Sequence, residues 1–154
     1  MKIRTAEIGD LPALTVLWEE FMDFHADLDP SHMRSEGAAD RWVAYVAGIL
    51  GDTSHRVLVA QEGTELSGYT VALIREYPPI FEFGTFGFIQ EIAVAAHRRR
   101  RGVARALLDA VEAWLRESGV PNAQVRVDVG NEASRSLFRG AGFEPFVETL
   151  IKAY

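Results

Sequence analysis

Five consecutive basic residues, His97 to Arg101, precede a glycine and a helix that begins with small residues. The pattern is Arg99-x-x-Gly102-x-Ala104, and it follows an apolar segment that ends at Val94. A strand that delivers a basic, glycine-containing turn to a helix N-terminus brings unpaired N–H groups, the helix dipole and cationic side chains together. This arrangement is suited to binding a pyrophosphate, although a solvated charged turn is the simpler interpretation of the same run.

The turn lacks the signatures of two common nucleotide-binding loops. It has neither the Gly-Lys-Ser/Thr end of a Walker A loop nor the GxGxxG pattern of a dinucleotide-binding turn. Gly102 permits a backbone conformation or a close approach that a side chain would block, and Ala104 keeps the helix mouth narrow. We therefore expect the backbone amides from Arg100 to Arg105 to converge on diphosphate oxygens.

Alternating strand and helix patterns must position this turn. The expected elements are a strand at 2–7, helices at 11–28 and 35–50, a hairpin of strands at 57–60 and 66–75, a strand at 86–94, a helix at 103–118, a strand at 123–129, a short helix at 131–141 and a last strand at 147–151. The order β-α-α-β-β-β-α-β-α-β predicts one α/β (α+β) domain over residues 1–154, with a mixed sheet and helices on both faces. Ligands of such sheets bind beyond the carboxyl ends of strands, where the basic turn lies.

Composition excludes several classes of protein. The net charge of −6 argues against a nucleic-acid partner, and no apolar run approaches the roughly 20 residues of a membrane span. The first ten residues lack the apolar core of a signal peptide, so we expect a cytoplasmic protein with no membrane partner. The absence of cysteine excludes disulfides, thiolate metal sites and cysteine nucleophiles.

Two segments resemble the GNAT superfamily of acetyl-CoA-dependent N-acetyltransferases. Residues 99–104, Arg-Arg-Arg-Gly-Val-Ala, resemble its Arg/Gln-x-x-Gly-x-Gly/Ala pyrophosphate loop, and residues 131–143 resemble its Asn-x-x-Ala-x-x-Leu-Tyr-x-x-x-Gly-Phe segment. Both stand in the family's order and at its usual separation. The resemblance implies a GNAT-like fold with a mostly antiparallel sheet. It also implies direct transfer of an acetyl or other acyl group from acetyl-CoA to an amine, in a ternary complex and without a metal.

The resemblance also implies which residues contact the cofactor. The pantetheine arm would lie between the strands at 86–94 and 123–129, and the N–H of Val94 would polarise the thioester carbonyl. Asn131 would touch the pantetheine or the outgoing thiol, although a helix cap is an equally compatible role for it. The full set is Ile92, Ala93, Val94, Arg99, Arg100, Arg101, Gly102, Val103, Ala104, Arg105, Asn131, Ser134 and Phe138.

Two departures from the family concern proton transfer. Phe138 stands where the family commonly has a tyrosine that protonates the thiolate, so this role falls to water, to Ser134 or to no group. Glu91 is the one carboxylate in the central strand and a candidate base, the alternative being a carboxylate paired with a helix residue. Strand alternation puts Gln90, Ile92 and Val94 on one face and Glu91 on the other, and the acidic position of several relatives aligns with Gln90.

The acceptor stays open between a small-molecule and a peptide amine. Asp27, Asp29, Glu76 and Glu82 favour a cationic one, and the aromatic segment at 76–83 favours an apolar body. The alternative function is a non-catalytic acyl-CoA-binding or regulatory module, which would bind acetyl-CoA without releasing CoA to any amine. The aromatic segment and the last strand offer routes to a homodimer.

Overall fold

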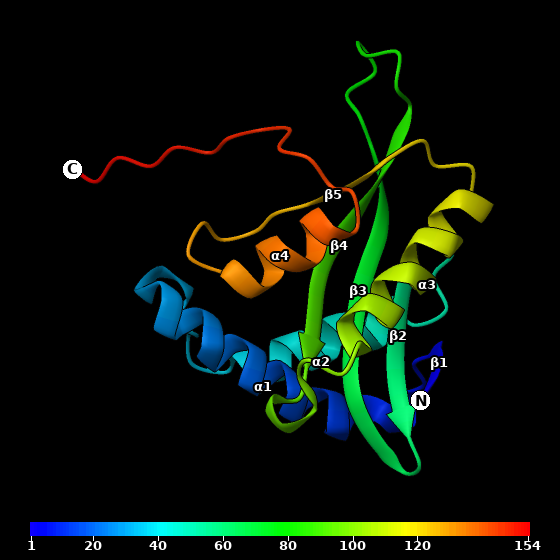
Figure 1. Cartoon of the computed structure of the whole chain (residues 1–154), viewed down its shortest axis with the longest axis vertical. Helices are drawn as coiled ribbons and strands as arrows, with labels where there is room; N and C mark the ends of the chain where they lie inside the picture. Colours follow the sequence, from blue (N-terminus) through cyan, green and yellow to red (C-terminus); the bar gives the residue numbers. More distant parts are fainter.

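The computed structural model describes residues 1–154 and contains one five-stranded sheet. Its strands are β1 (Lys2–Thr5), β2 (His55–Glu62), β3 (Glu65–Glu76), β4 (Thr85–Val94) and β5 (Ala123–Val125), hydrogen-bonded in that order. The first four strands are antiparallel, and β5 runs parallel to β4 (Figure 1). The predicted mixed and mostly antiparallel sheet is confirmed.

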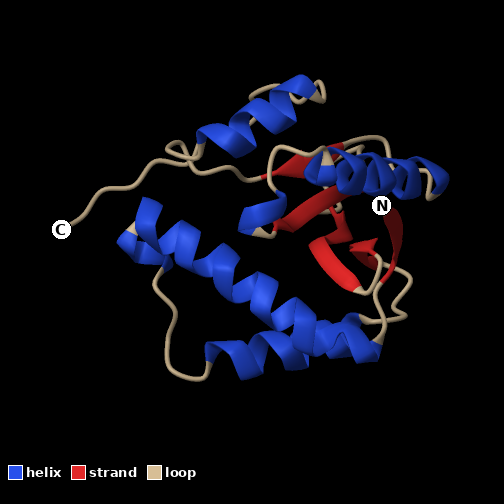
Figure 2. Cartoon of the chain, turned by 60° about the horizontal axis from the view of Figure 1, so that its bottom comes forward, coloured by secondary structure: helices blue, strands red, loops and turns tan.

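Helices cover both faces of this sheet (Figure 2). α1 (Leu11–Leu28) and α2 (Ala38–Ile49) form a layer on one face, while α3 (Val103–Glu117) packs on the other and α4 (Glu132–Gly140) follows β5. Short 3-10 turns lie at Ile8–Asp10, Pro30–His32 and Ala96–Arg98. The sheet therefore separates two hydrophobic cores.

The helical stripes explain this layering. In α1 the stripe is Leu14, Leu17 and Trp18, all buried against the strands. α3 buries Val103, Leu107, Leu108, Val111, Trp114 and Leu115, which recur at three- and four-residue spacing as an amphipathic helix requires. The connection from β4 through α3 to β5 is a βαβ unit, as predicted, so the basic turn lies at the carboxyl end of a central strand.

Two strand predictions are wrong. β5 ends at Val125 rather than at residue 129, because the chain turns where the Asp128 carboxylate accepts a hydrogen bond from the N–H of Gly130, at 2.7 Å. Residues 147–151 form no strand, and every side chain from Glu144 to Tyr154 is exposed. Strand-forming residues become a strand only when they pair with a neighbouring strand, and this segment pairs with no strand of the sheet.

No helix of the structure combines the length and apolar character that crossing a bilayer requires.

Candidate active site

The turn between β4 and α3 has the backbone conformation of an anion-binding loop. Gly102 precedes the first residue of α3 with φ of 81°, and Arg100 also has a positive φ, of 62°. A left-handed arginine is strained, and such strain is often found where backbone groups are aimed at a ligand. None of the backbone amides of residues 100–105 donates a hydrogen bond within the chain. Six N–H groups are therefore available at the positive end of the α3 dipole.

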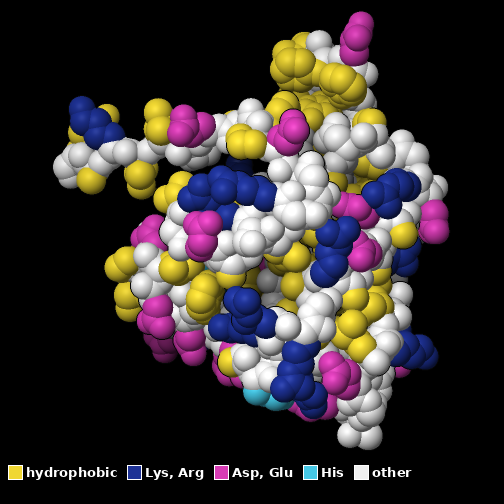
Figure 3. All heavy atoms as spheres, in the orientation of Figure 1, with side chains coloured by type: hydrophobic (Ala, Val, Ile, Leu, Met, Phe, Trp, Pro, Cys, Tyr) yellow, Lys and Arg dark blue, Asp and Glu magenta, His cyan; other side chains and the backbone are white.

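The basic run divides into a paired half and an unpaired half. His97 contacts Glu65 at 2.7 Å, and Arg98 forms ion pairs with Glu62 and Glu65, so these residues tie the turn to the β2–β3 hairpin. Arg100 and Arg101 are exposed and form no ion pair. Basic side chains gather on the surface around this turn (Figure 3). The cationic charge left for an anion comes mainly from residues 99–101.

The other predicted residues of the turn have local structural partners. The Arg99 guanidinium lies 5.3 Å from the Phe24 ring centre, and its Nε donates to the Val94 carbonyl at 3.3 Å. Val103 is buried in the core beneath α3. Arg105 Nε donates to the Asp109 carboxylate at 2.8 Å. The side chains of Val103 and Arg105 thus have partners within the chain, while their backbone amides have none.

β4 has an open edge beside this turn. The parallel pairing with β5 covers only Gly87 to Ile89, so Gln90 to Val94 have no strand on that side. A β-bulge at Gln90 shifts the register with β3, since Val71 pairs with Glu91 while Ala72 pairs with Ile89.

The bulge sets which backbone groups face this edge. Beyond it, the Ala95 N–H donates to the Ser67 carbonyl on the β3 side. Backbone groups alternate along a strand, so the N–H groups of Ile92 and Val94 point toward the open edge.

Glu91 lies on the α1–α2 face inside an aromatic cage. Trp42 Nε1 donates to its two carboxylate oxygens at 3.1 and 3.2 Å, and the Tyr69 hydroxyl donates at 2.8 Å. Burial raises the pKa of the Glu91 carboxyl above its ordinary value, and the bonds from Tyr69 and Trp42 oppose that rise. Burial also raises the pKa of Tyr69 well above its ordinary value, so its hydroxyl stays a donor. Glu91 is thus a desolvated carboxylate held in one orientation.

The prediction that Gln90 and Glu91 lie on opposite faces is wrong. Tyr45 of α2 donates to the Gln90 side-chain oxygen at 2.9 Å, so Gln90 also faces the α1–α2 layer. The reason is the bulge, because an extra residue interrupts the two-residue alternation of side chains. Ile92 and Val94 do pack toward α3, as alternation from Glu91 predicts.

Three aromatic residues of this cluster, Trp42, Tyr45 and Tyr69, were not identified from the sequence. Tyr69 is fully buried in the middle of β3, and Trp42 is buried in α2. A buried tyrosine or tryptophan needs an acceptor for its O–H or N–H. Glu91 is such an acceptor in the adjacent central strand, and this need for an acceptor was the signal that could have linked the three residues to it.

The α4 residues adopt mainly structural roles. Asn131 is buried, and its side-chain oxygen accepts a hydrogen bond from the Ser134 N–H at 3.1 Å, the helix-cap role considered for it. Phe138 is 4% exposed and packs edge-on against Phe143, with ring centres 5.3 Å apart. The contacts of Asn131, Ser134 and Phe138 with a cofactor stay predictions.

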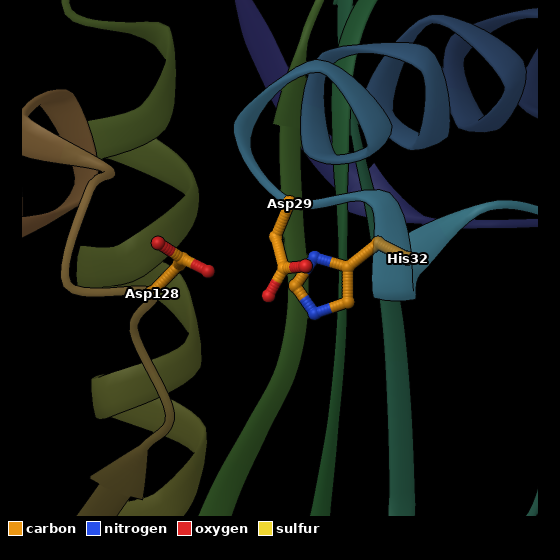
Figure 4. Close-up of side chains that lie close together, drawn as sticks. All are labelled: Asp29, His32 and Asp128. Atoms are coloured by element: carbon orange, nitrogen blue, oxygen red, sulfur yellow. The ribbon is translucent and has the colours of Figure 1, made fainter. Parts of the chain in front are cut away.

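Two of the acidic residues predicted near the acceptor, Asp29 and Glu76, lie in different parts of the structure. Asp29, which follows α1, lies close to His32 and Asp128 (Figure 4), and one ligand atom from each falls within 4.8 Å of the others. Glu76 pairs with Thr85 at the start of β4, roughly 30 Å along the strand from Val94 at about 3.3 Å per residue. The cluster of Asp29, His32 and Asp128 therefore joins the α1–α2 connection to the loop after β5.

Comparison with protein families assigns this chain to a class. The model of the Acetyltransferase (GNAT) family matches residues 14–143, so the chain belongs to that family. The match includes the turn at Gly102 and the segment that begins at Asn131.

Individual proteins are similar to this chain in sequence or in fold. The chain is 33% identical over 87 residues to the aminoglycoside N(6')-acetyltransferase type 1 of Klebsiella aerogenes, a match that covers 56% of this chain and 57% of that protein. A mutant Bacillus halodurans protein has the same fold, with a TM-score of 0.88, 19% identity and coverage of 100% and 99% of the two chains. A predicted acetyltransferase from Clostridium acetobutylicum, solved with acetyl-CoA, matches with a TM-score of 0.80, 15% identity and coverage of 99% and 95%.

Proposed function

We propose that this protein transfers an acetyl group from acetyl-CoA to an amine, and that the two substrates meet beside Gln90 to Val94 of β4. The observation that supports this most directly is the Gly102 turn, where six backbone amides without acceptors begin a helix next to an open strand edge. The diphosphate of acetyl-CoA would bind at these amides. Its pantetheine arm would pair with the backbone of Ile92 and Val94, as an added strand does.

The chemistry follows from the two sides of β4. The Val94 N–H would stabilise negative charge on the thioester oxygen while the amine nitrogen forms its bond to the carbonyl carbon. Glu91 would accept the proton that the acceptor ammonium must lose before its nitrogen can attack, through a water molecule because the carboxylate is enclosed by aromatic side chains. The C–S bond then breaks and CoA leaves as its thiolate, a tolerable leaving group because the ordinary thiol pKa is near 8.5. With no acid at Phe138, the thiolate takes up through solvent the second proton that the nitrogen releases as the amide forms.

A cationic acceptor fits the surroundings best. The chain carries a net charge of −6, and the carboxylates of Asp29 and Asp128 lie together across the gap between two loops. Each carboxylate also stabilises a local turn: Asp29 accepts a hydrogen bond from the Ser31 N–H, and Asp128 accepts one from the Gly130 N–H. Because the Klebsiella relative is an aminoglycoside acetyltransferase, aminoglycosides are the first amines to screen, followed by polyamines and basic peptides.

A glycine pair in the chain provides a matched test of the cofactor site. Gly102 and Gly63 both have positive φ, and a Cβ added at either would meet no atom within 4 Å. We expect Gly102→Trp to weaken acetyl-CoA binding at least tenfold in calorimetry, because the side chain obstructs the amides, while Gly63→Trp in the β2–β3 turn leaves it unchanged. Equal affinities for the two variants would refute this placement of the diphosphate. CoA release with the amine panel separates an enzyme from a non-catalytic acyl-CoA-binding module.

A further inference from the structure

Arg75 is a cationic side chain without an acidic partner, on the face of the sheet that carries Glu91. The adjacent Ile74 packs in the core beneath α3, so strand alternation puts Arg75 on the α1–α2 face. Its guanidinium lies over the Phe88 ring, 3.8 Å from the ring centre, and forms no ion pair within the chain. An exposed arginine that stacks on an aromatic ring and keeps its N–H groups free is suited to binding an anion.

The surface around Arg75 is a part of this face that the helices leave uncovered. The core beneath α1 and α2 reaches no farther along β3 than Val71, and the strands continue past this helical layer (Figure 1). Phe86 and Phe88 are half-buried there, and Tyr77 packs on Phe86 with ring centres 4.5 Å apart. An apolar floor beside one cation suits a ligand with an aliphatic body and an anionic end.

Tyr45 and Gln90 lie between this cation and the Glu91 carboxylate. The Tyr45 hydroxyl donates to Gln90, and burial is the main cause that raises its pKa. Glu91 raises the same pKa and Arg75 lowers it, so both charges act on one hydroxyl. Phe88 precedes Glu91 by three positions, which is about 10 Å along a strand. A ligand of that length can place one end near the carboxylate and the other at the guanidinium.

We propose that Arg75 determines acceptor specificity by binding a carboxylate of the same molecule whose amine is acetylated beside Glu91. This inference rests on the proposed function and narrows the acceptor to a basic amino acid that reacts at its side-chain amine. An α-amine is adjacent to its own carboxylate and cannot reach both groups of the protein. The α-ammonium keeps such an acceptor cationic overall. The guanidinium would bind the carboxylate through two parallel N–H···O bonds and takes no part in bond making or breaking.

Lysine and cadaverine are a matched pair of acceptors, because cadaverine is lysine without its carboxylate. We expect Arg75→Met to lower kcat/KM for lysine relative to cadaverine at least about tenfold, the scale of a hydrogen bond to a charged group. The loss should lie in KM for lysine, with kcat unchanged. Arg56→Met is the matched control, because Arg56 also stacks on an aromatic ring, 5.1 Å from the Trp114 ring centre, but on the α3 face. This control should keep the ratio of the unmodified protein.

Two further measurements separate the role of Arg75 from a structural one. Arg75→Lys should recover part of the ratio, since an ammonium keeps the charge but not the two-pronged contact. NMR of the lysine product should show the acetyl group on the side-chain nitrogen.

The outcomes distinguish this inference from the proposed function. An unchanged ratio in Arg75→Met, an equal loss for both amines, or acetylation of the α-amine overturns the role of Arg75 and leaves acetyl transfer in place. CoA release with other amines but with neither lysine nor cadaverine has the same meaning. CoA release with no amine of the panel overturns the proposed function and this inference together.

Discussion

On the α3 side of β4 the candidate cofactor site consists of backbone groups within residues 92–105, whereas on the α1–α2 side the Glu91 cluster takes side chains from α2, β3 and β4. The first half depends on one local conformation, the left-handed Gly102 at the start of α3. The second depends on three elements that are far apart in the sequence. A site built from backbone leaves a short sequence motif, while a site built from distant side chains leaves none.

Removal of the Glu91 carboxylate should have the largest effect, and it should affect catalysis without affecting cofactor binding. We expect Glu91→Gln to reduce kcat by at least about 10²-fold, the usual scale of general base catalysis, while calorimetric affinity for acetyl-CoA is unchanged. Steady-state CoA release with the best acceptor measures it. Glu62→Gln is the matched control, since Glu62 pairs with Arg98 outside the cluster. A Glu91→Gln rate within twofold of the unmodified enzyme would remove Glu91 from the mechanism.

A second change tests how far the backbone half relies on close packing. A Cβ at Gly68 would lie 2.6 Å from the Ala93 carbonyl oxygen and 3.1 Å from the Val103 side chain. We expect Gly68→Ala to destabilise the fold by about 1–3 kcal/mol and to weaken acetyl-CoA binding, because it displaces the end of β4. Gly84→Ala, where an added Cβ meets nothing within 4 Å, is the control. Thermal unfolding measures the change in stability, and calorimetry measures the affinity for acetyl-CoA. Unchanged affinity would show that cofactor binding tolerates a displacement of Ala93.

A third change adjusts the carboxylate without removing it. The Tyr69 hydroxyl lowers the pKa of Glu91 by donating to it, so Tyr69→Phe should raise that pKa further. The ionised base then forms only at higher pH, and the acid limb of the kcat/KM profile should move to higher pH. Tyr45→Phe, whose hydroxyl bonds to Gln90 instead, should leave the limb in place. An acid limb that does not move in Tyr69→Phe would argue that another group titrates.

The same pKa predicts the pH dependence of stability. The folded-state pKa of Glu91 lies above the unfolded value, so the folded state binds the proton more tightly. The stability from this group is present below the ordinary carboxyl pKa and is lost as pH rises through the raised value. Glu91→Gln should abolish this contribution, which chemical denaturation across that pH range can measure against Glu62→Gln.

The smallest expected effect concerns the acceptor. We expect Asp128→Asn to raise KM for a cationic amine by a few-fold, in line with the roughly 0.2–1 kcal/mol of partly exposed charge pairs. Asp27→Asn, at an exposed position in the last turn of α1, should change KM less. Steady-state kinetics at low and high salt would measure both, and the difference should shrink as salt increases. A larger effect of Asp27→Asn on KM would indicate that the acceptor binds at the outer face of α1.

The residues that could be predicted show where sequence information is local. The α3 stripe, the glycine turn and the unpaired amides follow from residues 94–115 alone. The prediction that Gln90 and Glu91 lie on opposite faces was wrong because a bulge interrupts the alternation, and that bulge depends on how β4 pairs with β3. The strand expected at 147–151 was wrong for a similar reason, since strand-forming residues do not supply their own partner edge.

The sequence by itself determined the order of elements from β1 to α4 and the position of the glycine turn before α3, because both depend on contacts between residues that are neighbours in the chain. Only the tertiary structure decided that Glu91 is enclosed by Trp42 and Tyr69, that Gln90 shares its face, and that the 144–154 segment stands free of the sheet. These outcomes depend on strand register and on packing between distant segments. Local sequence specifies the conformation that a residue prefers, whereas the partner it meets is set by the whole fold.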